Sequence, residues 1–237
     1  MELVGRHELF LLTGSFSPKQ GTTKHTGSMR ISTIDMETMS LFESGESSGQ
    51  ISFISLFDKN TKIQGVSKLT NEGVTKAIVR GGWPIAVIRN NENPLLYGKQ
   101  ALKSLCSTEM KEATGMNVDH TSVLALVKSL ARNITIPVKN ETIISDMTES
   151  GNPVTESTFY LYMNALKRLF VVREVPAWNP NIRSSTSIRS LPKKEFYETS
   201  IACAALNLGV EALSKDFITR GYLFESMCGR DLNKFFF

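Results

Sequence analysis

The middle of the chain constrains the fold most, because helical periodicity alternates there with strong helix breakers. Between His120 and Arg132 the apolar residues recur at i, i+3, i+4 and i+7, which predicts an amphipathic helix; they are Val123, Leu126, Val127 and Leu130. A second, short helix is predicted from Ile143 to Met147. It ends at the Gly151-Asn152-Pro153 break, since glycine and proline disfavour a helix interior.

Thr155 begins a third predicted helix, because a threonine hydroxyl caps the first turn well and Glu156 suits the positive end of the helix dipole. One face of this helix is apolar and carries Phe159, Met163, Leu166 and Phe170. The opposite face carries Ser157, Tyr160, Asn164, Lys167 and Arg168. Two helices separated by a short glycine-containing turn are typical of a helix-turn-helix, and the side chains of the second face suit base edges and phosphates.

The residues after the third helix predict a wing. Val171 to Val175 has the composition of a strand, and Trp178 to Lys194 that of an irregular, basic hairpin or loop. The latter segment has no acidic residue and four cations: Arg183, Arg189, Lys193 and Lys194. Its charge of +4 therefore equals the net charge of the whole chain. A strand and basic hairpin of this kind complete a winged helix, and concentrated positive charge favours contact with DNA phosphates.

Composition places the chain among globular proteins of the cell interior. Hydrophobic residues make up 41% of the 237 residues and charged residues 21%, too few charges for a disordered polyelectrolyte. No apolar run approaches the ~18–20 residues that span a bilayer, so no membrane partner is expected. Cys106, Cys203 and Cys228 are too far apart for a disulfide framework or a metal knuckle. We therefore expect reduced, buried thiols in a cytoplasmic protein.

No complete catalytic motif is present. Six residues rather than four separate Gly14 from Gly21, and Thr22 stands where the lysine of a phosphate-binding loop belongs. Histidines, cysteines and carboxylates do not cluster at metal-ligand spacing, and there is no nucleophile elbow. We therefore assign no catalytic residue and expect no metal site.

Other segments complete the predicted elements. Leu9–Leu12 is a short apolar run that suits a strand buried on both faces, and its lack of preceding sheet partners predicts low monomer stability or self-association. Residues 69–79 have helical character, which stops at Arg80-Gly81-Gly82-Trp83-Pro84. The alanine-rich stretch Thr199–Leu213 and the final Gly221–Lys234 each predict a further helix.

Short motifs are spread over nearly the whole chain: Leu11–Ser15, His25–Ile31, Met39–Gly49, Gly81–Pro84, Ala177-Trp178, Lys193–Phe196, Gly221–Ser226 and Arg230–Leu232. Together they resemble a prokaryotic AAA+-type ATPase family whose C-terminal domain of unknown function combines a winged helix with a restriction-endonuclease-like core. The Met-Ser-Leu-Phe-Glu-Ser stretch that begins at Met39 is the most specific of them.

The resemblance implies roles for three residues near the N-terminus. Thr13 and Ser15 correspond to the place where a sensor residue reads the γ-phosphate, and Arg30 resembles an arginine finger that acts on a neighbouring site. Met29 replaces the family's second glycine before that arginine. The family binds ATP and Mg²⁺ through a phosphate loop and an acidic pair that this sequence lacks. We therefore expect a chain truncated at both ends that binds no cofactor alone and hydrolyses no ATP.

The expected fold class is α/β at the N-terminus and mostly α beyond it: a C-terminal remnant of a P-loop ATPase core, a helical linker and a winged helix-turn-helix. The expected domains are the second half of an ATPase core at 1–65, a helical linker or lid at 66–115, the winged helix at 116–198, and the start of a truncated nuclease-like domain at 199–237.

Three functions stay open. The first is a non-catalytic fragment of an AAA+-type ATP-binding protein that associates with nucleic acid. The second is a stand-alone winged-helix module that binds DNA. The third is a protein-interaction module that docks on the missing ATPase segment or on a second copy of the chain.

Overall fold

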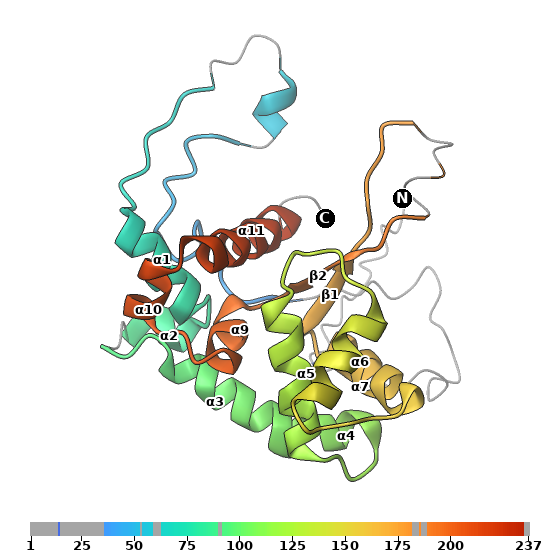
Figure 1. Cartoon of the computed structure of the whole chain (residues 1–237). Helices are drawn as coiled ribbons and strands as arrows, with labels where there is room; N and C mark the ends of the chain where they lie inside the picture. Colours follow the sequence, from blue (N-terminus) through green and yellow to red (C-terminus); the bar gives the residue numbers. More distant parts are fainter. Residues whose placement is uncertain are drawn as a thin grey trace, which may run out of the picture.

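The computed structural model describes residues 14, 36–52, 54–58, 63–89, 92–181, 185 and 189–234 of the chain. These residues form a mostly helical fold with one two-stranded antiparallel sheet, β1–β2 (Figure 1). The predicted mostly helical character is therefore confirmed. Leu9–Leu12, Thr13, Ser15 and Arg30 lie outside the described residues, and so does the region where the ATPase remnant is expected to begin.

The first helices lie between Asn71 and Thr114. They are α1 (Asn71–Arg80), α2 (Pro84–Arg89), α3 (Leu96–Ser104), a π-helical turn η2 (Leu105–Glu109) and α4 (Met110–Thr114). The Thr70 hydroxyl caps α1 by accepting from Gly73 N, and α1 ends at Gly81 (φ 75°). The helix predicted over 69–79 and its end at the glycine pair are thus confirmed.

The next elements follow the predicted order of three helices and a strand. They are α5 (His120–Arg132), α6 (Asn140–Glu149), α7 (Glu156–Arg168), β1 (Val172–Val175) and β2 (Lys193–Phe196). The Thr155 hydroxyl caps α7 by accepting from Thr158 N, as predicted. The second helix is longer than the five residues expected, because Asn140 to Thr142 add a first turn that carries no apolar periodicity.

The C-terminal part contains α9 (Thr199–Ala205), α10 (Val210–Lys215) and α11 (Phe217–Lys234). The helical character predicted over Thr199–Leu213 is confirmed, but it is divided between α9 and α10, because Asn207 takes a left-handed conformation (φ 53°) that ends α9. The last predicted helix exists, but it begins four residues before Gly221. Asp216 explains the earlier start, since its carboxylate accepts a hydrogen bond from Thr219 N at 3.0 Å.

Helix α9 lies at the centre of the fold (Figure 1). All seven of its residues are buried, and it contacts α1, α3, α5 and α11. The helices pack closely because α9 is built of small residues and because a Cβ at Gly98 in α3 would lie 2.3 Å from the Ser200 carbonyl oxygen. One hydrophobic cluster therefore extends from Ala77 to Met227 across the expected segment boundaries.

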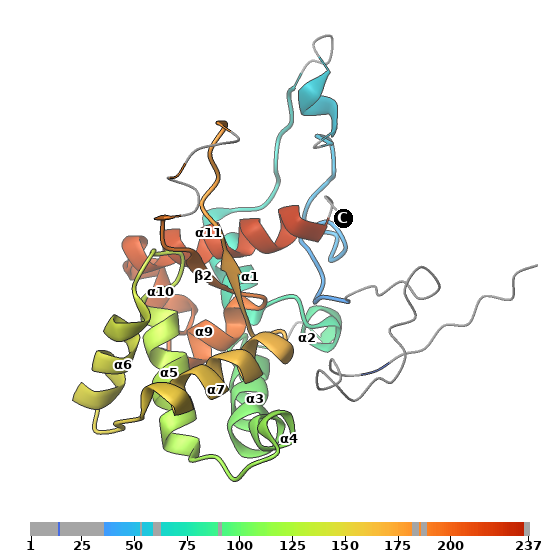
Figure 2. The same ribbon diagram turned by 90° about the vertical axis from the view of Figure 1, so that its right-hand side faces the viewer.

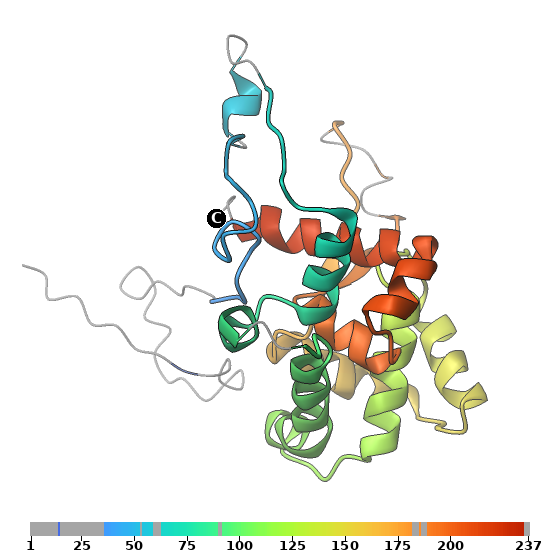
Figure 3. The same cartoon turned by 90° about the vertical axis from the view of Figure 1, so that its left-hand side faces the viewer.

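An arm extends from this helical body between the segment near Ser40 and α1. Its described residues include a short 3-10 helix, η1 (Ile54–Phe57), at the far end (Figure 2). The view from the opposite side shows that the two chain segments of the arm leave the helical body beside α1 (Figure 3). Several apolar side chains on the arm are exposed, including Ile54 at 79% and Val66 at 76%.

Candidate nucleic-acid interface

The outer face of α7 presents the predicted polar stripe. The inner side chains Phe159, Met163 and Leu166 are at most 3% exposed and belong to the hydrophobic core. On the opposite side Ser157, Tyr160 and Asn164 are exposed at i, i+3 and i+7. They form one line along the helix, which we call the α7 stripe. The expectation that Phe170 continues the inner face of the helix is wrong, because Phe170 (φ 54°) lies beyond the end of α7 and is only partly buried.

The two cations at the end of α7 point in different directions. Lys167 continues the α7 stripe, and its Nζ lies 2.6 Å from the Glu174 carboxylate on β1. Arg168 points back toward the end of α4, where its Nη1 donates to the Ala113 carbonyl oxygen at 3.0 Å. Only Lys167 therefore lies beside the three polar residues of the stripe.

The four cations expected in the wing also differ in burial and in partner. Lys194 is 3% exposed and donates to the Val138 carbonyl oxygen at 3.0 Å, and burial lowers the pKa of its ammonium group although Glu174 opposes this shift. Lys193 forms an ion pair with Glu225 of α11, and Arg189 is exposed. Arg183 lies outside the described residues.

A backbone hydrogen bond joins the β1–β2 hairpin to the segment between α5 and α6. In β1–β2 Val172 lies opposite Phe196 and Glu174 opposite Lys194. On the helical side Thr135, between α5 and α6, donates its backbone N–H to the Lys194 carbonyl oxygen at 2.9 Å. This hydrogen bond fixes β2 against the segment between α5 and α6.

Three carboxylates that pair with cations of this region were not predicted from the sequence: Glu174, Glu195 and Glu225. Glu195 lies 2.9 Å from Arg173 Nη2 in a mostly buried pair, beside a groove of about 390 Å³ between β1 and α11. Glu174 and Glu195 lie just outside the segment 178–194 whose charge was summed. Glu174, seven residues after Lys167 and in the following strand, was the one signal in the sequence that pointed to such pairing.

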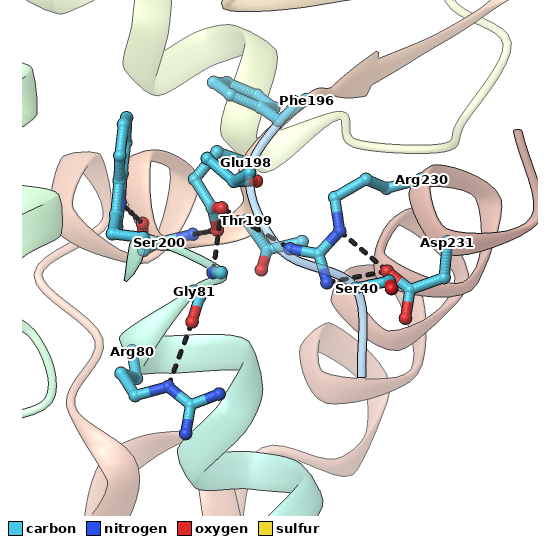
Figure 4. Close-up of polar contacts among 12 residues, drawn as sticks. Ser40, Arg80, Gly81, Phe196, Glu198, Thr199, Ser200, Arg230 and Asp231 are labelled. Carbon is cyan, nitrogen blue, oxygen red and sulfur yellow. Dashed lines mark hydrogen bonds and ion pairs between the residues drawn. The ribbon is translucent and has the colours of Figure 1, made fainter. Parts of the chain in front are cut away.

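A second polar cluster is buried between α1, α9 and α11 (Figure 4). Its centre is Glu198, 2% exposed, which accepts from Gly82 N at 2.9 Å and from Ser200 N at 3.3 Å. The guanidinium of Arg230, also 2% exposed, lies 3.4 Å from Glu198 and 2.7 Å from Asp231. Glu198, Arg230 and Asp231 are thus paired with one another inside the fold.

This cluster also fastens residues 38–47, which we call the strap. Met39 N donates to the Gly82 carbonyl oxygen at 2.7 Å, and Leu41 N donates to Asp231 at 2.9 Å. Arg80 binds Glu46 through two hydrogen bonds of 3.0 and 2.7 Å. The strap contains the Met-Ser-Leu-Phe-Glu-Ser motif, and the contacts of Met39 and Leu41 belong to it.

Other candidate chemistry is limited in the described part of the chain. No group of three or more His, Cys, Asp or Glu residues placed to hold a metal ion is found there. Cys203 is buried as expected, whereas Cys106 and Cys228 are only partly buried, which corrects the expectation for these two. Burial raises the pKa of Cys106 to about 11, so its thiol is unreactive at neutral pH. None of the described helices is long and apolar enough to cross a bilayer.

Comparison with known proteins gives one match. Residues 71–212, from the start of α1 into α10, match a family model described as a domain of unknown function, DUF8612. No curated protein and no solved structure matches the chain. The matched region includes all of the α7 stripe and the hairpin, and it leaves out the strap and α11.

Proposed function

Because this chain belongs to the DUF8612 family of domains of unknown function, we propose a function from its geometry: it binds duplex DNA through α7 and the β1–β2 hairpin. The observation that carries the proposal is the order of α5, α6 and α7 followed by an antiparallel hairpin that is hydrogen-bonded back to Thr135. This arrangement supports a winged helix, in which α7 would be the helix that enters the major groove.

The α7 stripe has the chemistry that base recognition needs. Asn164 can donate to and accept from one base edge at the same time, and the Ser157 and Tyr160 hydroxyls can do either. Asn140 of α6 lies 3.5 Å from the Tyr160 hydroxyl and extends the polar surface toward the neighbouring helix. Lys167 and the exposed Arg189 would contact phosphates on either side, and Arg183 is proposed for the same role from the sequence alone.

We also propose that the chain works as a non-catalytic part of an AAA+-type assembly. The resemblance of the strap motif to that family supports this. The proposal predicts no ATP hydrolysis by this chain alone. Phosphate release above that of the Arg30→Ala variant would contradict it.

A second candidate function is docking on a protein. It is favoured by the carboxylates of Glu174, Glu195 and Glu225, which reduce the positive charge around the hairpin. A winged helix with a neutral outer face suits a protein surface better than a phosphate backbone. In this case α7 would bind an ATPase polypeptide, and the two would co-purify.

The two candidates are separated by measuring binding to a labelled DNA duplex by fluorescence anisotropy at several salt concentrations. DNA binding predicts an affinity that falls with salt and is weakened by Tyr160→Ala with Asn164→Ala. Lys215→Ala is a matched control, because Lys215 is 74% exposed on α10 and remote from α7. A chain that does not bind DNA even at low salt would contradict the DNA proposal and favour docking.

A further inference from the structure

Glu174 occupies the end of the α7 stripe. Its carboxylate lies 2.6 Å from Lys167 Nζ, and both side chains are about one-third exposed. Glu174 also lies directly opposite Lys194 in the antiparallel pair, so it faces two cations. No other carboxylate among the described residues forms an ion pair with a residue of the stripe or with Lys167.

The exposure of this pair indicates that it serves no major structural purpose. Partly exposed ion pairs contribute little to the stability of a fold, because water screens them and ordering the side chains costs entropy. The pair between Arg173 and Glu195 on the same hairpin is different, since its side chains are only 12% and 7% exposed. Glu174 is therefore the carboxylate of the hairpin that can change partner without opening the core.

We propose that Glu174 limits the affinity of α7 for DNA by competing with a phosphate for Lys167. The inference rests on the proposed function, since it names the regulation of the same surface. When a phosphate approaches the end of α7, Lys167 must leave Glu174, and the Glu174 carboxylate is left near another negative charge. Binding then costs more than the stripe alone would require, so the affinity for duplex DNA is lowered.

The other charged groups near this end of α7 do not take the role that we propose for Glu174. Glu141 of α6 also acts on the buried Lys194, and burial lowers the pKa of that lysine. Lys194 bonds to a backbone carbonyl inside the fold and cannot replace Lys167 at a phosphate. Lys167 is thus the cation on this end of α7 whose freedom Glu174 controls.

The proposal is tested with the whole chain, a labelled duplex and five variants at a series of salt concentrations. Glu174→Gln is expected to bind roughly threefold to tenfold more tightly at low salt. The slope of log K against log salt should become steeper by up to about 0.9, because the Glu174 carboxylate freed on binding in the wild type takes up a cation and offsets the counterion that the Lys167 contact releases. Glu174→Asp keeps the charge and should behave like the wild type. Glu211→Gln is the control. It removes a carboxylate that is 86% exposed and paired with Lys215 on α10, and it should change neither the affinity nor the salt slope.

A double-variant cycle identifies Lys167 as the residue through which Glu174 acts. In a Lys167→Ala background, Glu174→Gln should no longer change the salt slope. An unchanged gain in that background would overturn the competition, because Glu174 would then act by repulsion alone. Equal affinity of the wild type and Glu174→Gln, with DNA binding intact, would overturn the inference and leave the proposed function standing. If no variant binds, Glu174→Gln included, both are overturned. A melting curve of each variant shows that all are folded.

Discussion

Gly82 donates its backbone N–H to the Glu198 carboxylate at 2.9 Å, which joins residues 116 positions apart. The same Gly82 accepts from Met39 N at 2.7 Å, so one glycine connects the strap to the cap of the central helix α9. The Trp83 indole N–H extends the connection by donating to the Ser200 hydroxyl at 2.9 Å. The Gly-Gly-Trp-Pro motif is therefore a joint between the strap, α1 and α9.

Replacing Gly82 with alanine should destabilise the protein strongly. The new Cβ would lie 2.1 Å from the Met39 carbonyl oxygen, a backbone atom that cannot move aside cheaply. We expect a loss of about 2–4 kcal/mol in the free energy of unfolding, measured by chemical denaturation. Gly221→Ala is the matched control, because a Cβ there meets nothing within 4 Å on the exposed side of α11. Gly221→Ala should be neutral or stabilise the protein by up to about 1 kcal/mol. Equal effects of the two substitutions would contradict the role of Gly82 in joining the segments.

Replacing Glu198 with glutamine should remove one of the two carboxylates that pair with the buried Arg230. The amide can still accept one of the two backbone hydrogen bonds, but its NH₂ group faces a donor and Arg230 keeps only Asp231. We expect a loss of about 2–4 kcal/mol in the free energy of unfolding. The same change at the exposed Glu211 should cost less than about 0.5 kcal/mol. A smaller loss at Glu198 than at Glu211 would show that the buried pair is dispensable.

The strap should loosen in acid. Hydrogen bonds from the Lys234 ammonium and from Ser40 N lower the pKa of Glu43 to about 2 from its ordinary value of 4.5. A carboxyl whose pKa is lower in the folded state stabilises the fold above pH 4.5, and this contribution is lost as the pH falls toward 2. The free energies of unfolding of the wild type and Glu43→Gln should therefore differ at neutral pH and converge between these values. A constant difference over this range would contradict the role of Glu43.

Local signals explain why the middle of the fold was predictable. The apolar spacing in α5 and the cap at Thr155 depend on residues within four positions of each other, so a single sequence contains them. The polar character of Ser157, Tyr160 and Asn164 followed from the same periodicity. The alanine-rich composition favours a helix here, but it does not show where the helix stops. Asn207 ends it because its left-handed conformation is incompatible with a continuing helix.

The contacts that remove charge from the surface were not predictable in this way. Lys194 is buried because Thr135 and Val138, more than fifty residues earlier, lie against β2. Lys193 meets Glu225 only because α11 crosses the hairpin. A sum of charges over residues 178–194 counts both lysines as free positive charge, whereas Lys194 is buried and Lys193 is paired with Glu225. The surface proposed to contact DNA therefore carries less exposed positive charge than the count of lysines and arginines over residues 178–194 indicates.

The end of α9 offers a last prediction at a single residue. Asn207 has φ 53°, Leu208 N donates to the Cys203 carbonyl oxygen at 2.8 Å, and Asn207 N donates to Ala204, so the helix ends in a Schellman motif. Glycine adopts this conformation more easily than asparagine, and alanine adopts it at a cost. We expect Asn207→Gly to change the free energy of unfolding by less than about 0.5 kcal/mol and Asn207→Ala to lower it by about 1 kcal/mol. Gly151, which follows α6 with φ 80° and open space around it, provides the reciprocal case, since Gly151→Ala should cost a similar amount for backbone reasons alone. If Asn207→Ala proved as stable as Asn207→Gly in thermal unfolding, the left-handed turn would not be what separates α9 from α10.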